Sequence, residues 1–240
     1  MDAERNQVVG VDGCRFGWIA VAGKVEPETM RLYRTFSELW QEWQDAVAIA
    51  VDMPIGLPTG RHSRACDQAA RSILQVRAGA GSRVFPCPIR EVLACATYPA
   101  ALELHRRVGG RGLSKQAFYL LPKIRQIDAL LQTTPASREP LFECHPELAA
   151  ARLNGGVPLG TKKRQADLRR RLKLLCDWYP SIIDFYEQWR LDLGSRAKPD
   201  DLVDALLCWL TARRPLARRG RLPVGDLPLD VTGLPMQIVF

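Results

Sequence analysis

Two short apolar runs that each end in aspartate constrain the fold more than any other feature of this sequence. Residues 7–12 (Gln-Val-Val-Gly-Val-Asp) and 47–52 (Val-Ala-Ile-Ala-Val-Asp) are nearly unbroken in apolar residues, which is typical of strands buried on both faces. Residues 18–22 and 30–35 predict two more strands, the first of them joined to residues 7–12 by a short glycine-containing hairpin connection. A helix expected from residue 36 precedes the run at 47–52. It allows a crossover connection, and therefore a strand parallel to the first.

The rest of the chain predicts a helical insertion followed by one strand and several helices. Residues 57–137 interrupt the strand pattern, and residues 141–145 predict the fifth strand before Pro146 stops it. We therefore expect one α/β domain over residues 1–240, with a mixed five-stranded sheet of three antiparallel and then parallel strands, flanked by helices. The helices are expected at 63–77, 98–107 and 114–132 within the insertion, and at 147–153, 161–177, 180–191 and 200–213 after it.

Asp12 and Asp52 occupy equivalent positions at the carboxyl ends of the two buried strands. Ligands of open α/β sheets bind at this edge, and neighbouring parallel strands would place the two carboxylates about 5 Å apart. Two such charges repel each other unless a cation or a proton lies between them. Oxygen ligands of this kind suit Mg²⁺ or Mn²⁺, although either aspartate alone is equally typical of a residue that caps a turn.

Further acids follow the fifth strand and open the last helix. Asp201 and Asp204 lie three residues apart and so share a helix face. They are candidate metal ligands, but acids in a first turn also complement the helix dipole. Asp204 precedes an almost uninterrupted apolar helix, where a carboxylate is costly without a partner. Glu143 and His145 alternate onto one side of the fifth strand and are candidate catalytic residues, His145 with a structural role as the alternative.

The chain carries a formal charge of +8 and has a pI near 9.3, which favours polyanionic partners such as DNA or RNA. Its basic residues concentrate in three runs, at 61–90, 105–125 and 162–173. Each run also suits a solvated helix face. As phosphate-binding candidates we take residues whose side chains donate hydrogen bonds to phosphate: Arg15, Arg61, Arg64, Arg71, Lys115, Lys123 and Lys162.

The seven cysteines form no Cys-x-x-Cys pair and are scattered along the chain. This pattern fits neither a zinc finger nor a disulfide framework, so we expect reduced thiols. The N-terminal residues lack the pattern of a secretory signal, and no apolar run approaches the length of a membrane span. We therefore expect a cytoplasmic protein that does not bind membranes.

Several motifs resemble the RNase H-like family of predicted nucleases known as domain of unknown function 429. They occur in the family's order: GVDGCRFGW at 10–18, VDMPIGLP at 51–58, RACDQAAR at 64–71, VFPCP at 84–88, ECHPE at 143–147 and DDLVDA at 200–205. The resemblance implies three antiparallel strands, a helix and two more strands. It also implies that acids of the first strand, the fourth strand and the last helix hold a divalent metal. Asp12 and Asp52 match the strand acids, and Asp201 with Asp204 resembles the Asp-x-x-Asp pair of resolvase-type members.

Three functions are compatible with these observations. The leading one is a metal-dependent nuclease that hydrolyses phosphodiesters with Mg²⁺ or Mn²⁺ and an activated water. The second is a nucleotide-handling enzyme of the actin or sugar-kinase type, but the loop at 13–17 lacks the Ser or Thr of a phosphate loop. The third is a nucleic-acid-binding module of the same fold without catalysis. Metal binding separates the first from the third, and ATP hydrolysis identifies the second.

Overall fold

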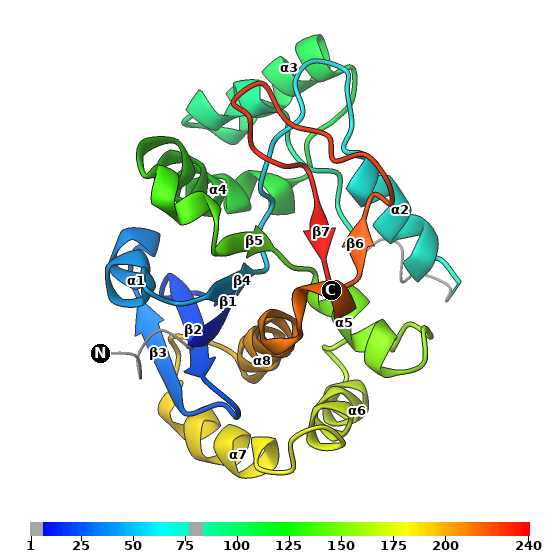
Figure 1. Cartoon of the computed structure of the whole chain (residues 1–240). Helices are drawn as coiled ribbons and strands as arrows, with labels where there is room; N and C mark the ends of the chain where they lie inside the picture. Colours follow the sequence, from blue (N-terminus) through cyan, green and yellow to red (C-terminus); the bar gives the residue numbers. More distant parts are fainter. Residues whose placement is uncertain (1–6, 77–83) are drawn as a thin grey trace.

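A computed structural model of the chain describes residues 7–76 and 84–240. Its centre is a mixed five-stranded sheet with the strand order β3-β2-β1-β4-β5 (Figure 1). β1 pairs antiparallel with β2 and parallel with β4, and β5 is parallel to β4. This confirms the expected fold class. The strands are β1 (Val8–Gly13), β2 (Trp18–Gly23), β3 (Thr29–Tyr33), β4 (Ala48–Val51) and β5 (Leu141–Glu143).

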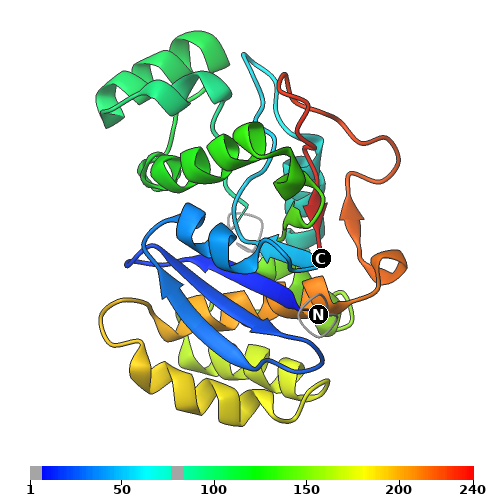
Figure 2. The same ribbon diagram turned by 60° about the vertical axis from the view of Figure 1, so that its left-hand side comes forward.

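Helices cover both faces of the sheet. Alternate residues of each central strand point to opposite faces, so Val8 and Ala50 join one core while Val9 and Val51 join the other. The helix α8 lies on the first face with α6 and α7 beyond it, and α1 and α4 lie on the second face (Figure 2). The helices are α1 (Phe36–Trp43), α2 (Ala65–Leu74), α3 (Tyr98–Gly109), α4 (Lys115–Thr133), α5 (Pro146–Leu153), α6 (Gln165–Cys176), α7 (Ile182–Asp192) and α8 (Pro199–Arg213).

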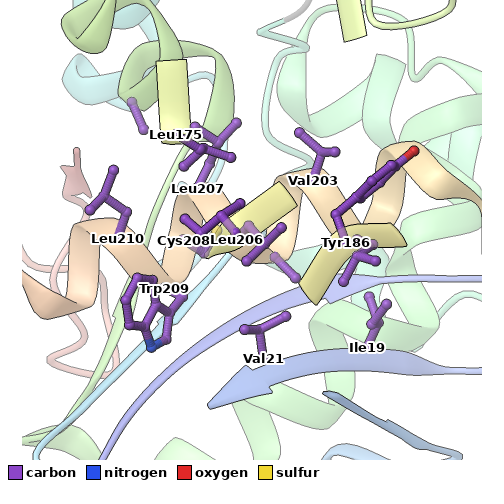
Figure 3. Packing of buried hydrophobic residues seen from close by; sticks show 14 of the residues in the cluster. Ile19, Val21, Leu175, Tyr186, Val203, Leu206, Leu207, Cys208, Trp209 and Leu210 are labelled. Carbon is purple, nitrogen blue, oxygen red and sulfur yellow. The ribbon is translucent and has the colours of Figure 1, made fainter. Parts of the chain in front are cut away.

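The apolar helix α8 is buried on the sheet, as its composition predicted. Leu206 and Trp209 are fully buried, and Figure 3 shows α8 residues packed beside Ile19 and Val21 of β2. The close approach depends on Gly10 in the middle of β1. A Cβ atom built at Gly10 would overlap the backbone of α8 at Ala205 and Trp209. The absence of a side chain at this position therefore lets the helix lie directly on the strand.

We expect Gly10→Ala to lower the free energy of unfolding by about 1–3 kcal/mol or more, because the methyl group forces α8 away from β1. Gly112→Ala is a matched control, since the nearest atom to a Cβ there is 4.0 Å away. Urea unfolding of both variants measures the difference. Equal stability of the two variants would contradict the close packing.

The insertion contains α2, α3 and α4 together with the short 3₁₀ helices Arg90–Ala94 and Pro135–Arg138. Two expected helices are shorter in the structure. The helix expected at 63–77 spans Ala65–Leu74, with residue 77 outside the described residues, and the helix expected at 161–177 begins at Gln165. In the second case the backbone before Gln165 forms a loop that carries Lys162 to Asp204.

The C-terminal segment returns to the sheet, which was not predicted. After the 3₁₀ turn Leu216–Arg218, β6 (Arg221–Leu222) pairs with β7 (Ile238–Val239). Val239 also forms a parallel bridge with Cys144, directly after β5. Within the described residues, no helix is both long and apolar enough to cross a membrane.

Candidate metal centre

Three carboxylates from distant parts of the sequence meet at the carboxyl ends of β1 and β4. Asp12 lies at the end of β1, Asp52 directly follows β4, and Asp204 lies one turn into α8. The strand register pairs Val11 with Val51, and the Asp52 amide donates to the Val11 carbonyl at 2.9 Å. One carboxylate oxygen of each aspartate lies within 4.8 Å of those of the other two. The expected proximity of Asp12 and Asp52 is therefore confirmed.

Burial makes this cluster of acids unfavourable for three negative charges. Asp12 is 7% exposed and Asp204 only 2%. Burial, followed by repulsion from Asp52 and Asp204, raises the pKa of Asp12 well above its usual range. Burial and the charge of Asp204 raise the pKa of Asp52 to about 8. Burial likewise raises the pKa of Asp204 to about 6, although Lys162 opposes the shift.

Lys162 supplies one positive charge to the cluster. Its ammonium group forms an ion pair with Oδ2 of Asp204. Burial alone would lower the pKa of Lys162, but the three aspartates raise it above its usual value. The other oxygen of Asp204, Oδ1, is buried and has no hydrogen-bond donor among the described residues. A buried unpaired oxygen on one of three clustered carboxylates fits a divalent cation with oxygen ligands.

In metal-free buffer we expect Asp52 to make the protein less stable as the pH rises. The folded protein keeps a proton on Asp52 up to about pH 8, whereas the unfolded chain releases it near the ordinary aspartate pKa of 3.8. The folded state thus binds more protons within this window, and the free energy of unfolding falls as the pH increases through it.

Thermal unfolding of the wild type and Asp52→Asn between about pH 5 and pH 9 tests this linkage. The melting temperature of Asp52→Asn minus that of the wild type should increase with pH, and exposed Asp45→Asn serves as the control. A difference that is constant over the range would contradict the assignment.

Glu143 lies beside the cluster but is held by Arg64. The Arg64 guanidinium is 1% exposed and donates to the two Glu143 carboxylate oxygens at 2.6 and 2.7 Å. It also donates to Asp67 and to the carbonyls of Ile55 and Gly56. Both Glu143 oxygens are thus used in a buried ion pair, and Glu143 is not one of the three clustered acids. Burial raises the pKa of Glu143 to about 7 even though Arg64 lowers it.

Asp201 and His145 line the same cavity as the three aspartates. Asp201 accepts a hydrogen bond from the Lys198 amide at 2.8 Å and lies in the first turn of α8, in line with the alternative of a first-turn acid. Burial lowers the pKa of His145. Its Nδ1 atom is buried and has no partner among the described residues. Burial therefore favours the neutral imidazole, but Nδ1 does not reach the surface of the cavity.

The structure separates the candidate phosphate-binding residues. Lys162 lines the cavity, and the stem of Lys123 lies against Gly13 at the end of β1. Arg71 donates to the Val84 carbonyl at 2.9 Å. Arg61 and Arg64 precede α2, which begins at Ala65, so they do not share a helix face with Arg71. Arg64 is buried, whereas three residues of the set are exposed on the surface: Arg15, Arg61 and Lys115.

Other residues of the site were not found from the sequence. Glu147, which lines the cavity, accepts from the fully buried Arg171 at 2.8 and 2.9 Å. Phe85 and Gln116 also line it. Arg171 lies in the basic run 162–173, for which a solvated helix face was the alternative interpretation. No periodicity in the sequence links Arg171 with Glu147. The one signal in the sequence was energetic: an acid buried at the start of α5 is costly unless it has a partner, so a basic partner could have been expected.

The fold and the site together define an α/β protein with a carboxylate cluster at the ends of its parallel strands. The model of one protein family, described as "Protein of unknown function (DUF429)", matches residues 10–228. The match extends from β1 to beyond β6 and includes all three clustered aspartates, and the chain belongs to this family. No curated protein and no solved structure matches the chain.

Proposed function

We propose that the protein is a divalent-metal-dependent nuclease of the RNase H-like type, with Asp12, Asp52 and Asp204 as metal ligands. The observation that carries the proposal is the convergence of three carboxylates, two of them buried and that of Asp52 half-buried, with an unpaired oxygen on Asp204. Carboxylates in such an arrangement select hard cations, Mg²⁺ or Mn²⁺. The basic character of the chain favours a nucleic acid as the substrate.

When bound, the ion would supply an activated water and neutralise charge on the phosphate. The reaction consumes one water: its oxygen forms a bond to phosphorus, the bond from phosphorus to the leaving oxygen breaks, and that oxygen takes up a proton. Lys162, Lys163 and Arg164 line the cavity on one side and bind the negative phosphate. His145 lines the same cavity and limits the space that the phosphate can occupy.

A substrate panel with and without Mg²⁺ or Mn²⁺ tests the function. DNA, RNA and branched substrates should be cleaved only in the presence of the ion, and ATP should not be hydrolysed. Hydrolysis of ATP without nucleic-acid cleavage would instead identify a nucleotide-handling enzyme. Salt-sensitive binding of nucleic acid with no bound divalent ion at millimolar concentrations would identify a binding module.

Lys162 holds a positive charge against Asp204, one of the proposed metal ligands, through their ion pair. We expect Lys162→Gln to increase the affinity for Mg²⁺ or Mn²⁺ by at least about tenfold, which corresponds to ~1.4 kcal/mol, because a nearby positive charge is removed. Lys163→Gln is the matched control, since Lys163 lines the cavity but is exposed. Isothermal titration measures both affinities. Equal affinities of the two variants would show that Lys162 does not oppose metal binding.

A further inference from the structure

The three aspartates lie within a cavity of about 690 Å³. Its floor is formed by the carboxyl ends of the central strands. The insertion contributes one wall through Phe85 and through Gln116 and Leu120 of α4, and the loop before α6 contributes another through Lys162. The acids thus lie in a partly open cleft whose walls come from the core and the insertion together.

Buried polar contacts hold the cover of this cavity in place. The Asp67 carboxylate, itself bound by Arg64, accepts from the Cys87 amide at 3.3 Å, and Arg71 donates to the Val84 carbonyl at 2.9 Å. The segment that carries Phe85 is therefore fixed on both sides. Its position is set by the ion pair that joins Arg64 to Glu143 of β5.

The α4 part of this wall is also fixed to the core. The Gln126 side-chain oxygen on α4 accepts from the Trp18 indole at 3.0 Å and from the Phe36 amide at 2.7 Å. These contacts hold α4 against β2 and α1. A substrate has to fit the existing space, because both covering segments are tied to the sheet by specific hydrogen bonds.

The lining combines three kinds of chemistry in one cleft. Carboxylates form the floor, the cations of the Lys162–Arg164 loop lie on one side, and apolar groups including Phe85, Leu120 and Ile238 lie elsewhere in the lining. A nucleotide presents matching groups, since it has a phosphate and an aromatic base that stacks on aromatic side chains. Cavities of roughly 300–1,000 Å³ are the usual size of small-ligand sites. A base-paired duplex does not deliver a phosphate into such a site unless a nucleotide leaves the stack.

We propose that the group admitted to this site is a single unpaired nucleotide unit, with its phosphate at the carboxylates and its base against Phe85. The unit belongs either to a free nucleotide ester or to the unpaired end of a strand. This inference rests on the proposed nuclease function and narrows its substrate class, because continuous duplex is excluded.

The test compares four substrates of the wild-type protein with Mn²⁺. They are the p-nitrophenyl ester of thymidine 5′-phosphate, a linear single strand, the same strand in circular form, and a covalently closed duplex. We expect cleavage of the ester or of the linear strand from its end, with closed duplex at least about 100-fold slower. Cleavage of the ester alone identifies free nucleotide esters as the source, and cleavage of the linear strand identifies strand ends. If the closed duplex or the circular strand is cleaved as fast as the linear single strand, the inference is overturned while the proposed nuclease function stands.

A binding measurement decides the inference independently of catalysis. Titration of thymidine 5′-monophosphate in Ca²⁺ should show binding that weakens at least about tenfold in Phe85→Leu, which keeps an apolar group but removes the ring, and recovers in Phe85→Tyr. Tyr119→Ala, an exposed aromatic residue of α4 outside the cavity lining, is the control. Affinity unchanged by Phe85→Leu would overturn the role of Phe85. Binding that depends on Phe85 without cleavage of any substrate would refute the nuclease function but support the nucleotide site.

Discussion

Asp12→Asn is expected to reduce metal-dependent phosphodiester cleavage by more than about a hundredfold. Loss of residues that only support a metal ligand already costs about 10- to 100-fold, and Asp12 is itself one of the three clustered acids. Asparagine keeps the shape and the oxygen that accepts from the Gly13 amide at 2.6 Å. It removes a charge from a site where burial and two further aspartates already oppose ionisation.

The same substitution should not destabilise the metal-free protein, because it relieves repulsion among the three acids. We therefore expect a melting temperature equal to or above that of the wild type without metal. We also expect Asp12→Asn to lack the increase that Mg²⁺ or Mn²⁺ should produce in the wild type. Cleavage rates and melting curves of both proteins, each with and without the ion, measure these effects. An Asp12→Asn protein that retains cleavage and metal-dependent stabilisation would exclude Asp12 as a ligand.

Arg64→Met is expected to lower the free energy of unfolding by about 3–5 kcal/mol, the usual cost of removing one partner of a buried ion pair. Arg64 is 1% exposed and bonds to Glu143 and Asp67. Its loss leaves two buried acids without their cation and two backbone carbonyls without a donor. The damage should extend to the segment that carries Phe85, which depends on Asp67.

Chemical denaturation of three variants isolates the ion pair. Arg71→Met is the matched control, since Arg71 is partly exposed and donates to the Val84 carbonyl rather than to a buried acid among the described residues, so it should cost only about 1 kcal/mol. The double variant Arg64→Met with Glu143→Gln should be more stable than the sum of the single changes predicts, because no charge of Glu143 remains unpaired. Additive effects would show that Arg64 and Glu143 do not interact in solution.

The sheet and two of the clustered acids follow from local sequence patterns. Apolar runs identified the strands ending at Asp12 and Asp52, and the helix between them predicted the parallel pairing that brings the two together. Asp204 was found by a different signal, a charge at the start of an otherwise apolar helix. In each case the information lies within a few residues of the acid, which is why one sequence is sufficient.

The partners of these acids could not be predicted in the same way. Lys162 pairs with Asp204, and Arg64 pairs with Glu143, and each pair joins segments that no periodicity connects. A basic residue has the same local pattern whether it faces solvent, phosphate or a buried acid. Only tertiary packing decides between these environments, and it places Arg64 in the interior beside Glu143.

The packing of α8 against Gly10 also determines when the cluster of three acids can form during protein synthesis. Asp12 and Asp52 are synthesised early and Asp204 late, and contacts between such distant segments form slowly in folding. A chain on the ribosome from which α8 has not yet emerged contains Asp12 and Asp52 but lacks a folded Asp204. The cluster of three acids therefore cannot form at that stage. The nuclease activity proposed above would begin only after translation has passed this helix, and the messenger and ribosomal RNA beside the growing chain would not be exposed to it.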